Sequence, residues 1–308
     1  EYLLVKSFYV VFEAIIDELI GDKPLPDGMD KRQEDGKIVD HLFTAQSLID
    51  RDDKQTYYIG DSKYYKMGHE LGPEAVYKQY TYARNVIQWN LDIFNNGGQT
   101  DSGVKLRDDV TEGYNVIPNF FISAKVSESF DYSDDGIDKT DRRHNKYKKV
   151  QFKNRLFDRD TLLLFHYDVN FLFVLSLYAR DNTTQKAKWK QSIRAKFRKE
   201  IQEWLQTDYD FYAMQAHPGV DAKKYIKEHF QDVLGKIYTP FKNETVFSLA
   251  LESKNPESVA IRTELGKYFY IKELALGDDP ISAINAAKVE VHAMMAADPS
   301  KDGVLMVM

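Results

Sequence analysis

Cysteine is absent from the 308 residues of the chain. This absence excludes a disulfide scaffold, a cysteine-ligated zinc site and thiol catalysis. A long apolar run is also missing, because the most apolar stretch, residues 162–178, is interrupted by His166, Asp168 and Asn170 and is a poor membrane span. The chain begins at Glu1 rather than Met and opens in the middle of a pattern, which indicates a fragment or a processed chain. No signal-peptide pattern is visible in the sequence. We therefore expect a soluble, cytoplasmic protein with no membrane partner.

An excess of positive charge is lacking as well. The 42 Lys and Arg residues face 48 Asp and Glu residues, which leaves a net charge of −6. A basic coat over the whole molecule is therefore excluded, whereas a local basic surface is not. Hydrophobic residues make up 43% of the chain, enough for a sizeable core, and the length predicts one large domain or two ordinary ones.

The first part of the chain alternates between helical and strand patterns. Apolar spacing and turn residues predict a helix at 7–20, strands at 37–43 and 56–65, a helix at 73–90 and a strand at 116–124. This order predicts an α/β domain at residues 1–125. We expect an exposed basic linker or insertion at 126–155 and a mixed α/β accessory region at 156–308.

The accessory region has fewer clear patterns. Residues 161–178 are buried and predict a strand, a helix or both. The other predicted elements are helices at 186–205, 221–234 and 280–296 and a strand at 247–251. Asp221 is expected to cap the start of its helix.

The most informative stretch is Tyr-Tyr-Ile-Gly-Asp-Ser-Lys-Tyr-Tyr-Lys at residues 57–66. Because side chains alternate along a strand, Asp61 and Lys63 are expected on the same face. The carboxylate can hold Mg²⁺, and the ammonium can orient water or stabilise negative charge in a transition state. A lone Asp-x-Lys is also common in ordinary strands, where the two residues pair or cap a turn. A metal site therefore needs a second carboxylate.

Two further acids are candidates for that role. Asp40 lies on the preceding predicted strand, and neighbouring strands would bring it to the same edge as Asp61. Glu13 lies on the otherwise apolar first helix, from which it could reach a metal directly or through water. The acids within residues 50–53 compete with Asp40, but a polar turn favours their solvation.

The order of these residues resembles the PD-(D/E)XK nuclease superfamily. Four short sequence motifs are similar to those of the nuclease subunits of McrBC-type and LlaJI-type restriction systems. They are Phe12-Glu13, Val39-Asp40, residues 59–66 and Gln79-Tyr80-Thr81-Tyr82-Ala83. Residues 117–124 and 154–160 also look like LlaJI-type sequence, while the motif match covers residues 7–124. Val39 stands where the family name has proline.

The resemblance implies a restriction-endonuclease-like core, a small mixed sheet flanked by helices, that hydrolyses DNA phosphodiesters in defence against foreign DNA. It implies a Mg²⁺ site, with Mn²⁺ able to substitute. The implied metal ligands are Asp40, Asp61, Glu13 and the Ser62 carbonyl. Lys63 would be the catalytic lysine, and Gln79 would position it or contact the DNA backbone.

Partners follow from the same resemblance and from charge. No nucleotide-binding motif is visible, so an AAA+ GTPase of the McrB type would supply NTP energy. Two basic tracts, 139–155 and 186–199, contain aromatic residues and suit phosphate contacts, although a solvated helix face or loop is the alternative. The candidate DNA-binding residues are Arg142, Arg143, Lys146, Lys148, Lys149, Lys188, Lys190 and Arg194.

Two other functions stay open. One is a catalytically inactive DNA- or partner-binding subunit with a nuclease fold, against which the intact Asp61-Ser62-Lys63 argues. The other is a repair or RNA-cleaving nuclease, which would use the same metal site. His41, His69 and His166 lack metal-ligand spacing and are expected to be ordinary surface or partly buried histidines.

Overall fold

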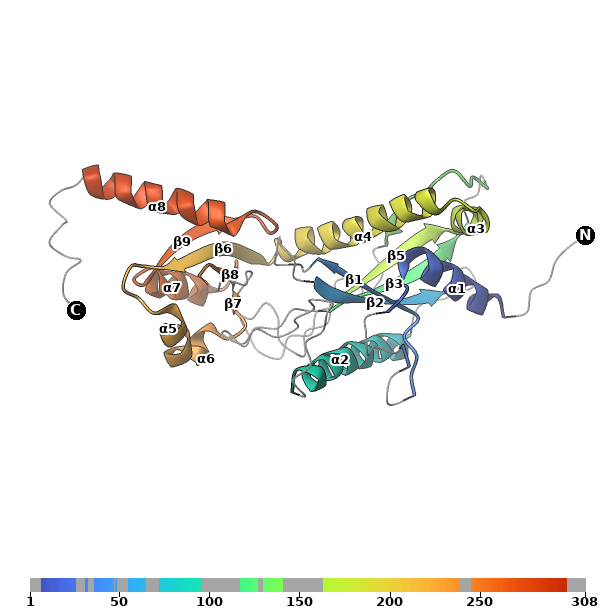
Figure 1. The fold of residues 1–308 in the computed structure, drawn as a ribbon, viewed down its shortest axis with the longest axis horizontal. Helices are drawn as coiled ribbons and strands as arrows, with labels where there is room; N and C mark the ends of the chain where they lie inside the picture. Colours follow the sequence, from blue (N-terminus) through green and yellow to red (C-terminus); the bar gives the residue numbers. More distant parts are fainter. Residues whose placement is uncertain are drawn as a thin grey trace, which may run out of the picture.

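The computed structural model describes residues 7–25, 31–32, 36–46, 48, 55–64, 72–95, 117–126, 130–140, 163–238 and 245–297. Within these residues the chain forms a five-stranded and a four-stranded sheet, and the long helix α4 (Thr183–Leu205) leads from one to the other (Figure 1). We call the first sheet with helices α1–α4 the N-terminal unit. The second sheet with α5–α8 is the C-terminal unit.

The sheet of the N-terminal unit is mixed and has the order β1-β2-β3-β5-β4. Strands β2, β3 and β5 are parallel, whereas β1 and β4 pair antiparallel with their neighbours. The strands are β1 (His41–Gln46), β2 (Gln55–Lys63), β3 (Pro118–Lys125), β4 (Ile137–Lys139) and β5 (Leu163–Asn170). The carboxyl ends of the three parallel strands meet at one edge, where ligands bind in open α/β sheets.

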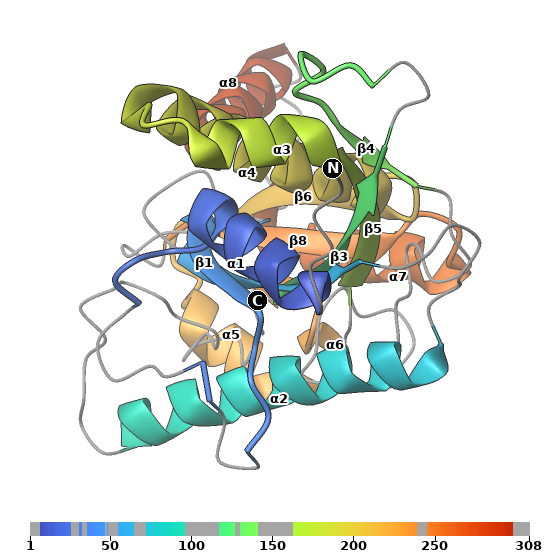
Figure 2. The same cartoon turned by 90° about the vertical axis from the view of Figure 1, so that its right-hand side faces the viewer.

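Helices cover both faces of this sheet. Helix α2 (Pro73–Asn95) lies on one face, and α1 (Phe8–Ile20), α3 (Phe171–Ala179) and α4 lie on the other (Figure 2). The alternation along β2 explains the layers, because Tyr57 and Ile59 pack in the cluster that contains Tyr82 of α2. Tyr58 packs instead with the buried stripe of α1, which recurs at helical spacing.

The sheet continues beyond the boundary expected at residue 125. Strand β5 pairs with β3 over eight residues, and β4 lies at its outer edge. Residues 163–179 form a strand followed by a helix, β5 and then α3. The expected linker at 126–155 contains β4, whose Ile137 is fully buried. The N-terminal unit therefore extends beyond residue 125, because β5 pairs with β3 from a distant part of the chain. No local sequence pattern reveals such pairing.

The C-terminal unit has an antiparallel sheet of order β7-β8-β6-β9. Its elements are β6 (Tyr209–Ala216), α5 (Ala222–Glu228), α6 (Phe230–Val233), β7 (Ile237–Tyr238), β8 (Phe247–Glu252), α7 (Pro256–Leu265), β9 (Phe269–Leu274) and α8 (Pro280–Ala297). This order and pairing is a ferredoxin-like β-α-β-β-α-β arrangement with an added helix. Sequence patterns missed β6, β7, β9 and α7.

The two units share a buried cluster at the end of α4, where Trp204 and Leu205 pack with Tyr209 and Phe211 of β6.

Asp221 caps α5 as expected, because its Oδ1 accepts a hydrogen bond from the Lys224 N–H at 3.0 Å. Among the described residues, no helix combines the length and apolarity that crossing a membrane requires.

Candidate active site

The carboxyl end of β2 carries the acid and the lysine that the sequence places on one face. Asp61 lies opposite Phe121 and Lys63 opposite Ser123 in the parallel pairing with β3. Asp61 is fully buried, and the Lys63 Nζ lies 2.5 Å from its Oδ1. A buried carboxylate is costly without a charge partner. The lysine supplies that partner, so the two residues form one electrostatic unit.

Asp40 directly precedes β1, where His41 pairs with Gly60, so it reaches the same edge as Asp61. Its Oδ2 accepts a hydrogen bond from the Ser62 N–H at 3.3 Å. Burial, the charge of Asp61 and a hydrogen bond with that carboxyl raise the pKa of Asp40 to about 8. The two carboxyl groups therefore share one polar site, in which their proximity disfavours the doubly ionised state when no cation is bound.

Glu13 approaches this pair from α1. Burial is the main cause that raises the pKa of its carboxyl, and the charge of Asp61 raises it further, whereas Lys63 and Lys78 lower it. The apolar neighbours Phe12 and Ile16 anchor α1 against the sheet, which leaves Glu13 at the rim of the site. The structure thus brings Glu13, Asp40, Asp61 and Lys63 together.

Gln79 lies on the face of α2 that covers the sheet, with Val76 and Tyr82 one turn away on either side. Its side chain is fully buried, and neither amide atom has a hydrogen-bond partner among the described residues. Gln79 therefore makes no hydrogen bond to Lys63, and its alternative role, a contact with the DNA backbone, stays a prediction. A buried amide without a partner is unusual in a folded protein and marks a position where a bound group can be recognised.

Lys78 was missed by the sequence analysis. Its Nζ lies 4.0 Å from Asp61 Oδ2 and 5.3 Å from the centre of the Tyr82 ring. Burial lowers the pKa of Lys78, but a hydrogen bond with Tyr82 and the charges of Asp61 and Asp40 outweigh it and leave the pKa raised. The spacing of Lys78 and Tyr82, four residues apart on a helix, was the available signal.

A buried polar network holds Asp40 in place from the other face of β2. The Nε2 of His41 lies 2.5 Å from Ser62 Oγ, and its Nδ1 lies 3.5 Å from Asp17 Oδ1. Lys31 contacts Asp17 and donates to the Asp40 carbonyl oxygen at 2.7 Å. His41 is fully buried, contrary to the surface or partly buried position expected, and burial lowers its pKa. A neutral imidazole thus joins α1 to β1 and β2.

The donors fit a hard divalent cation. Mg²⁺ binds oxygen, keeps several waters and commonly uses one or two carboxylates. Asp40 and Asp61 supply two, and a cation between them would remove the repulsion that raises the pKa of Asp40. No group of three or more His, Cys, Asp or Glu side chains in the described part of the chain is arranged to hold a metal ion. Glu13 would consequently act through water.

Two of the candidate DNA-binding residues have another task. Lys190 donates to the Gly21 carbonyl oxygen at 2.7 Å. Arg194 donates to the Ile20 carbonyl oxygen and to Asp22 Oδ1, at 3.1 and 2.6 Å. Both side chains join α4 to the end of α1. The sequence analysis did not expect this role in the fold.

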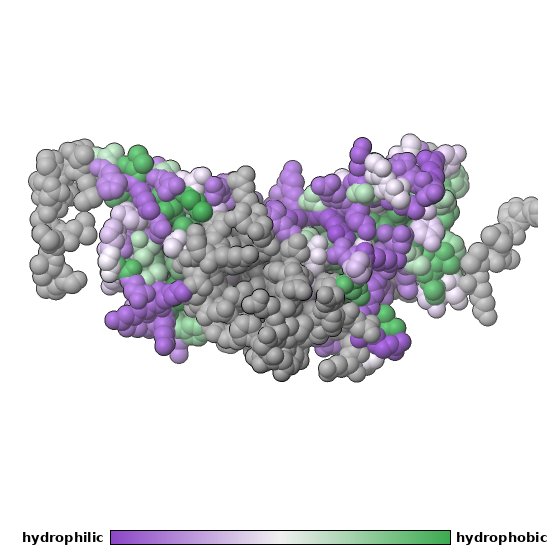
Figure 3. Space-filling model, in the orientation of Figure 1, coloured by the Kyte–Doolittle hydropathy of each residue, from purple (hydrophilic) through white to green (hydrophobic). Residues whose placement is uncertain are grey.

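The remaining basic candidates are divided between the two tracts. Lys188 is exposed on α4, where the molecular surface is largely hydrophilic (Figure 3). The others lie outside the described residues and are Arg142, Arg143, Lys146, Lys148 and Lys149.

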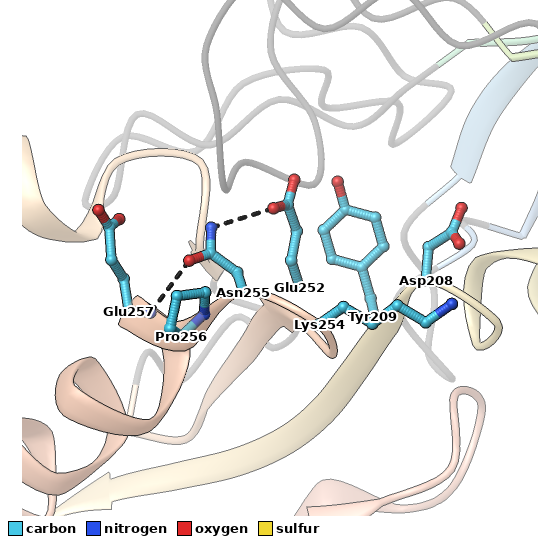
Figure 4. A pocket seen from close by; sticks show the side chains of 7 residues that line it. All are labelled: Asp208, Tyr209, Glu252, Lys254, Asn255, Pro256 and Glu257. Carbon is cyan, nitrogen blue, oxygen red and sulfur yellow. Dashed lines mark hydrogen bonds between the residues drawn. The ribbon is translucent and has the colours of Figure 1, made fainter.

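The C-terminal unit contains a separate polar cavity of about 570 Å³ (Figure 4). It is lined by Asp208, Tyr209, Glu252, Lys254, Asn255, Pro256 and Glu257. Asn255 donates to Glu252 at 3.1 Å and accepts from the Glu257 N–H at 3.0 Å, which caps α7.

No family model, curated protein or solved structure matches the chain. A functional interpretation therefore depends on the geometry of the site at the end of β2.

Proposed function

We propose that the chain is a Mg²⁺-dependent nuclease that hydrolyses phosphodiester bonds of DNA. One observation carries the proposal. The fully buried Asp61 is paired with Lys63 at 2.5 Å, beside Asp40, whose pKa is raised to about 8, at the carboxyl edge of parallel strands. A buried and a partly buried carboxyl group destabilise each other, and such perturbed groups cluster at functional sites. A cation that binds both would offset the repulsion.

Each side chain has a task in this reaction. Asp40 and Asp61 would hold Mg²⁺, which when bound lowers the pKa of a coordinated water and polarises a phosphoryl oxygen. Lys63, whose Nζ contacts Asp61, orients the attacking water and stabilises charge that develops on the phosphate. Glu13 accepts hydrogen bonds from water at the rim, and the backbone of Ser62 holds Asp40 in place. Gln79 is available to bind substrate.

Separate observations support the type of nuclease core, the restriction function, the partner and the DNA contacts. The order helix, strand, strand, helix, strand around a mixed sheet supports a restriction-endonuclease-like core. The sequence resemblance over residues 7–124 supports a restriction function in the cytoplasm. The resemblance to McrBC-type systems supports an AAA+ GTPase as a partner. DNA contacts by Lys188 and by the tract at 139–155 complete the proposal.

The test is cleavage of supercoiled plasmid with Mg²⁺, with Mn²⁺ and with EDTA, by the wild type and by the Asp61→Asn and Lys63→Met variants. We expect nicked and linear DNA from the wild type with either metal and none from the variants. Thermal melting of all three proteins controls for folding. Cleavage that survives both substitutions would contradict the proposal.

Parallel substrates separate the other functions. Cleavage of RNA in preference to DNA would favour an RNA-cleaving enzyme, and cleavage restricted to damaged or branched DNA would favour a repair nuclease. DNA binding without cleavage, with or without GTP and an AAA+ protein, would favour an inactive binding subunit.

A further inference from the structure

The proposed chemistry uses one lysine, but the site contains two. Lys63 from β2 lies 2.5 Å from Asp61 Oδ1, and Lys78 from α2 lies 4.0 Å from Asp61 Oδ2. The buried carboxylate is thus flanked by ammonium groups that come from different elements. Lys78 belongs neither to the metal ligands nor to the hydrophobic core, so its position needs an explanation.

Lys78 is more exposed to solvent than Lys63 is. Its side chain is 38% exposed, against 15% for Lys63. A separation of 4.0 Å from Asp61 is longer than a hydrogen bond, so Asp61 does not saturate the donors of this ammonium. The Tyr82 ring lies below it, and Tyr82 is fixed because its hydroxyl donates to the Ile38 carbonyl oxygen at 2.5 Å.

A purely structural role explains this arrangement poorly. Asp61 already has Lys63 at 2.5 Å, so the Lys78 ammonium at 4.0 Å is not its closest charge partner. Tyr82 already joins α2 to the segment before Asp40 through its own hydrogen bond. The lysine is not needed for that contact.

Charge balance favours an anionic ligand. The site gathers Glu13, Asp40 and Asp61 against two lysines. With a divalent cation on the carboxylates, both ammonium groups lose their main anionic partner and are repelled by the cation. A phosphodiester carries one negative charge and gains a second as water attacks phosphorus, which two lysines on opposite sides can stabilise.

We propose that Lys78 is a second phosphate-binding cation, which contacts a non-bridging oxygen of the scissile phosphodiester. This inference rests on the proposed nuclease function and assigns it a further catalytic residue. The water oxygen forms a bond to phosphorus, and the bond between phosphorus and the leaving sugar oxygen breaks. The water proton passes to solvent, and the leaving oxygen takes a proton from solvent. Lys78 keeps its protons throughout and acts by charge and hydrogen bonding.

The experiment compares Lys78→Met, Lys78→Arg and the control Lys224→Met, whose side chain is 70% exposed on α5 of the other unit. Single-turnover cleavage of a labelled DNA duplex is measured with Mg²⁺. Binding of the same duplex is measured with Ca²⁺ over a range of salt concentrations. We expect Lys78→Met to reduce the cleavage rate about 100-fold, as removal of one transition-state donor does. Lys78→Arg should recover at least part of that loss, and Lys224→Met should resemble the wild type.

The salt dependence provides a readout that a structural role would not change. Loss of one phosphate contact should reduce the slope of log affinity against log salt by about 1. A wild-type rate and slope in Lys78→Met would overturn the assignment while leaving the nuclease intact. A slow variant with an unchanged slope, a lowered melting temperature and no recovery by arginine would also overturn it. If the wild type itself does not cleave, the nuclease proposal fails, and the binding slope still decides whether Lys78 contacts phosphate.

Discussion

The two units of the molecule use polar side chains differently. In the N-terminal unit, Asp61, Gln79 and His41 are fully buried on or beside one sheet, and Asp61 lies 2.5 Å from Lys63 and 4.0 Å from Lys78. In the C-terminal unit, the exposed Asp221 and the partly buried Asn255 cap helices. Caps add to stability, whereas buried charge costs free energy and persists where a ligand needs it. The contrast places the candidate chemistry in the first unit.

The largest effect is expected on DNA cleavage when the charge of Asp61 is removed. Asp61→Asn should lower DNA cleavage by about 10³-fold or more, because it removes a metal ligand and the partner of Lys63. Single-turnover cleavage measures the loss. Asp221→Asn, which keeps a capping oxygen in the C-terminal unit, is the matched control and should cleave as the wild type does. Equal rates for both variants would remove the distinction between the units.

The next effect concerns packing directly beside the site. A Cβ at Gly60 would lie 2.2 Å from the Phe120 ring, which is buried against Phe43 and Phe197. Gly60→Ala should therefore destabilise the protein by about 1–3 kcal/mol through overpacking. Urea denaturation measures this change. Gly72→Ala, with no atom within 4 Å of the added Cβ, is the control. A fully stable Gly60→Ala protein would show that the ring can move.

The third effect is a dependence of stability on pH. Asp40 has a pKa of about 8 in the folded protein, well above the 3.8 of an unperturbed aspartate, so the folded state binds an extra proton between these values. Stability without metal should therefore fall as pH rises from about 4 to about 8. Asp61, Glu13 and Lys78 are the charged groups that act on this carboxyl.

Melting temperatures from pH 5 to pH 8, with EDTA and with Mg²⁺, measure the effect. Asp40→Asn should flatten the curve, and Mg²⁺ should reverse the loss at pH 8 in the wild type only. The buried His41 has a lowered pKa and acts in the opposite sense, so the comparison uses the difference between the two proteins. Identical curves for both would argue against the raised pKa.

The smallest effect lies in the C-terminal unit. Asp221→Ala removes the oxygen that accepts from the Lys224 N–H and should cost about 1 kcal/mol of stability. Urea denaturation measures it, and cleavage should be unchanged. Asp232→Ala, an acid on the neighbouring short helix α6, serves as the comparison. A loss of cleavage in Asp221→Ala would mean that the C-terminal unit takes part in the reaction.

Local patterns predicted much of the molecule. The stripe from Phe12 to Leu19 has helical spacing and forms α1, and the alternation along residues 56–65 forms β2. The same alternation placed Asp61 and Lys63 on one face. These predictions succeeded because the period of a regular element depends on its own backbone.

Contacts between distant segments were not predictable in this way. The sequence placed Lys190 and Arg194 in a basic tract, but the structure commits both to the end of α1. It also brings Lys78 from α2 to Asp61 on β2, a proximity that neither segment reveals alone.

The sequence by itself determined α1, α2, α4, β2, β3 and the shared face of Asp61 and Lys63, because these follow from the periodicity of side chains along one element. The tertiary structure alone decided that β5 joins the sheet beside β3 and that Lys78 comes close to Asp61. Their approach depends on which surfaces meet after the layers pack. Strand pairing and helix packing bring together segments that are far apart in the sequence.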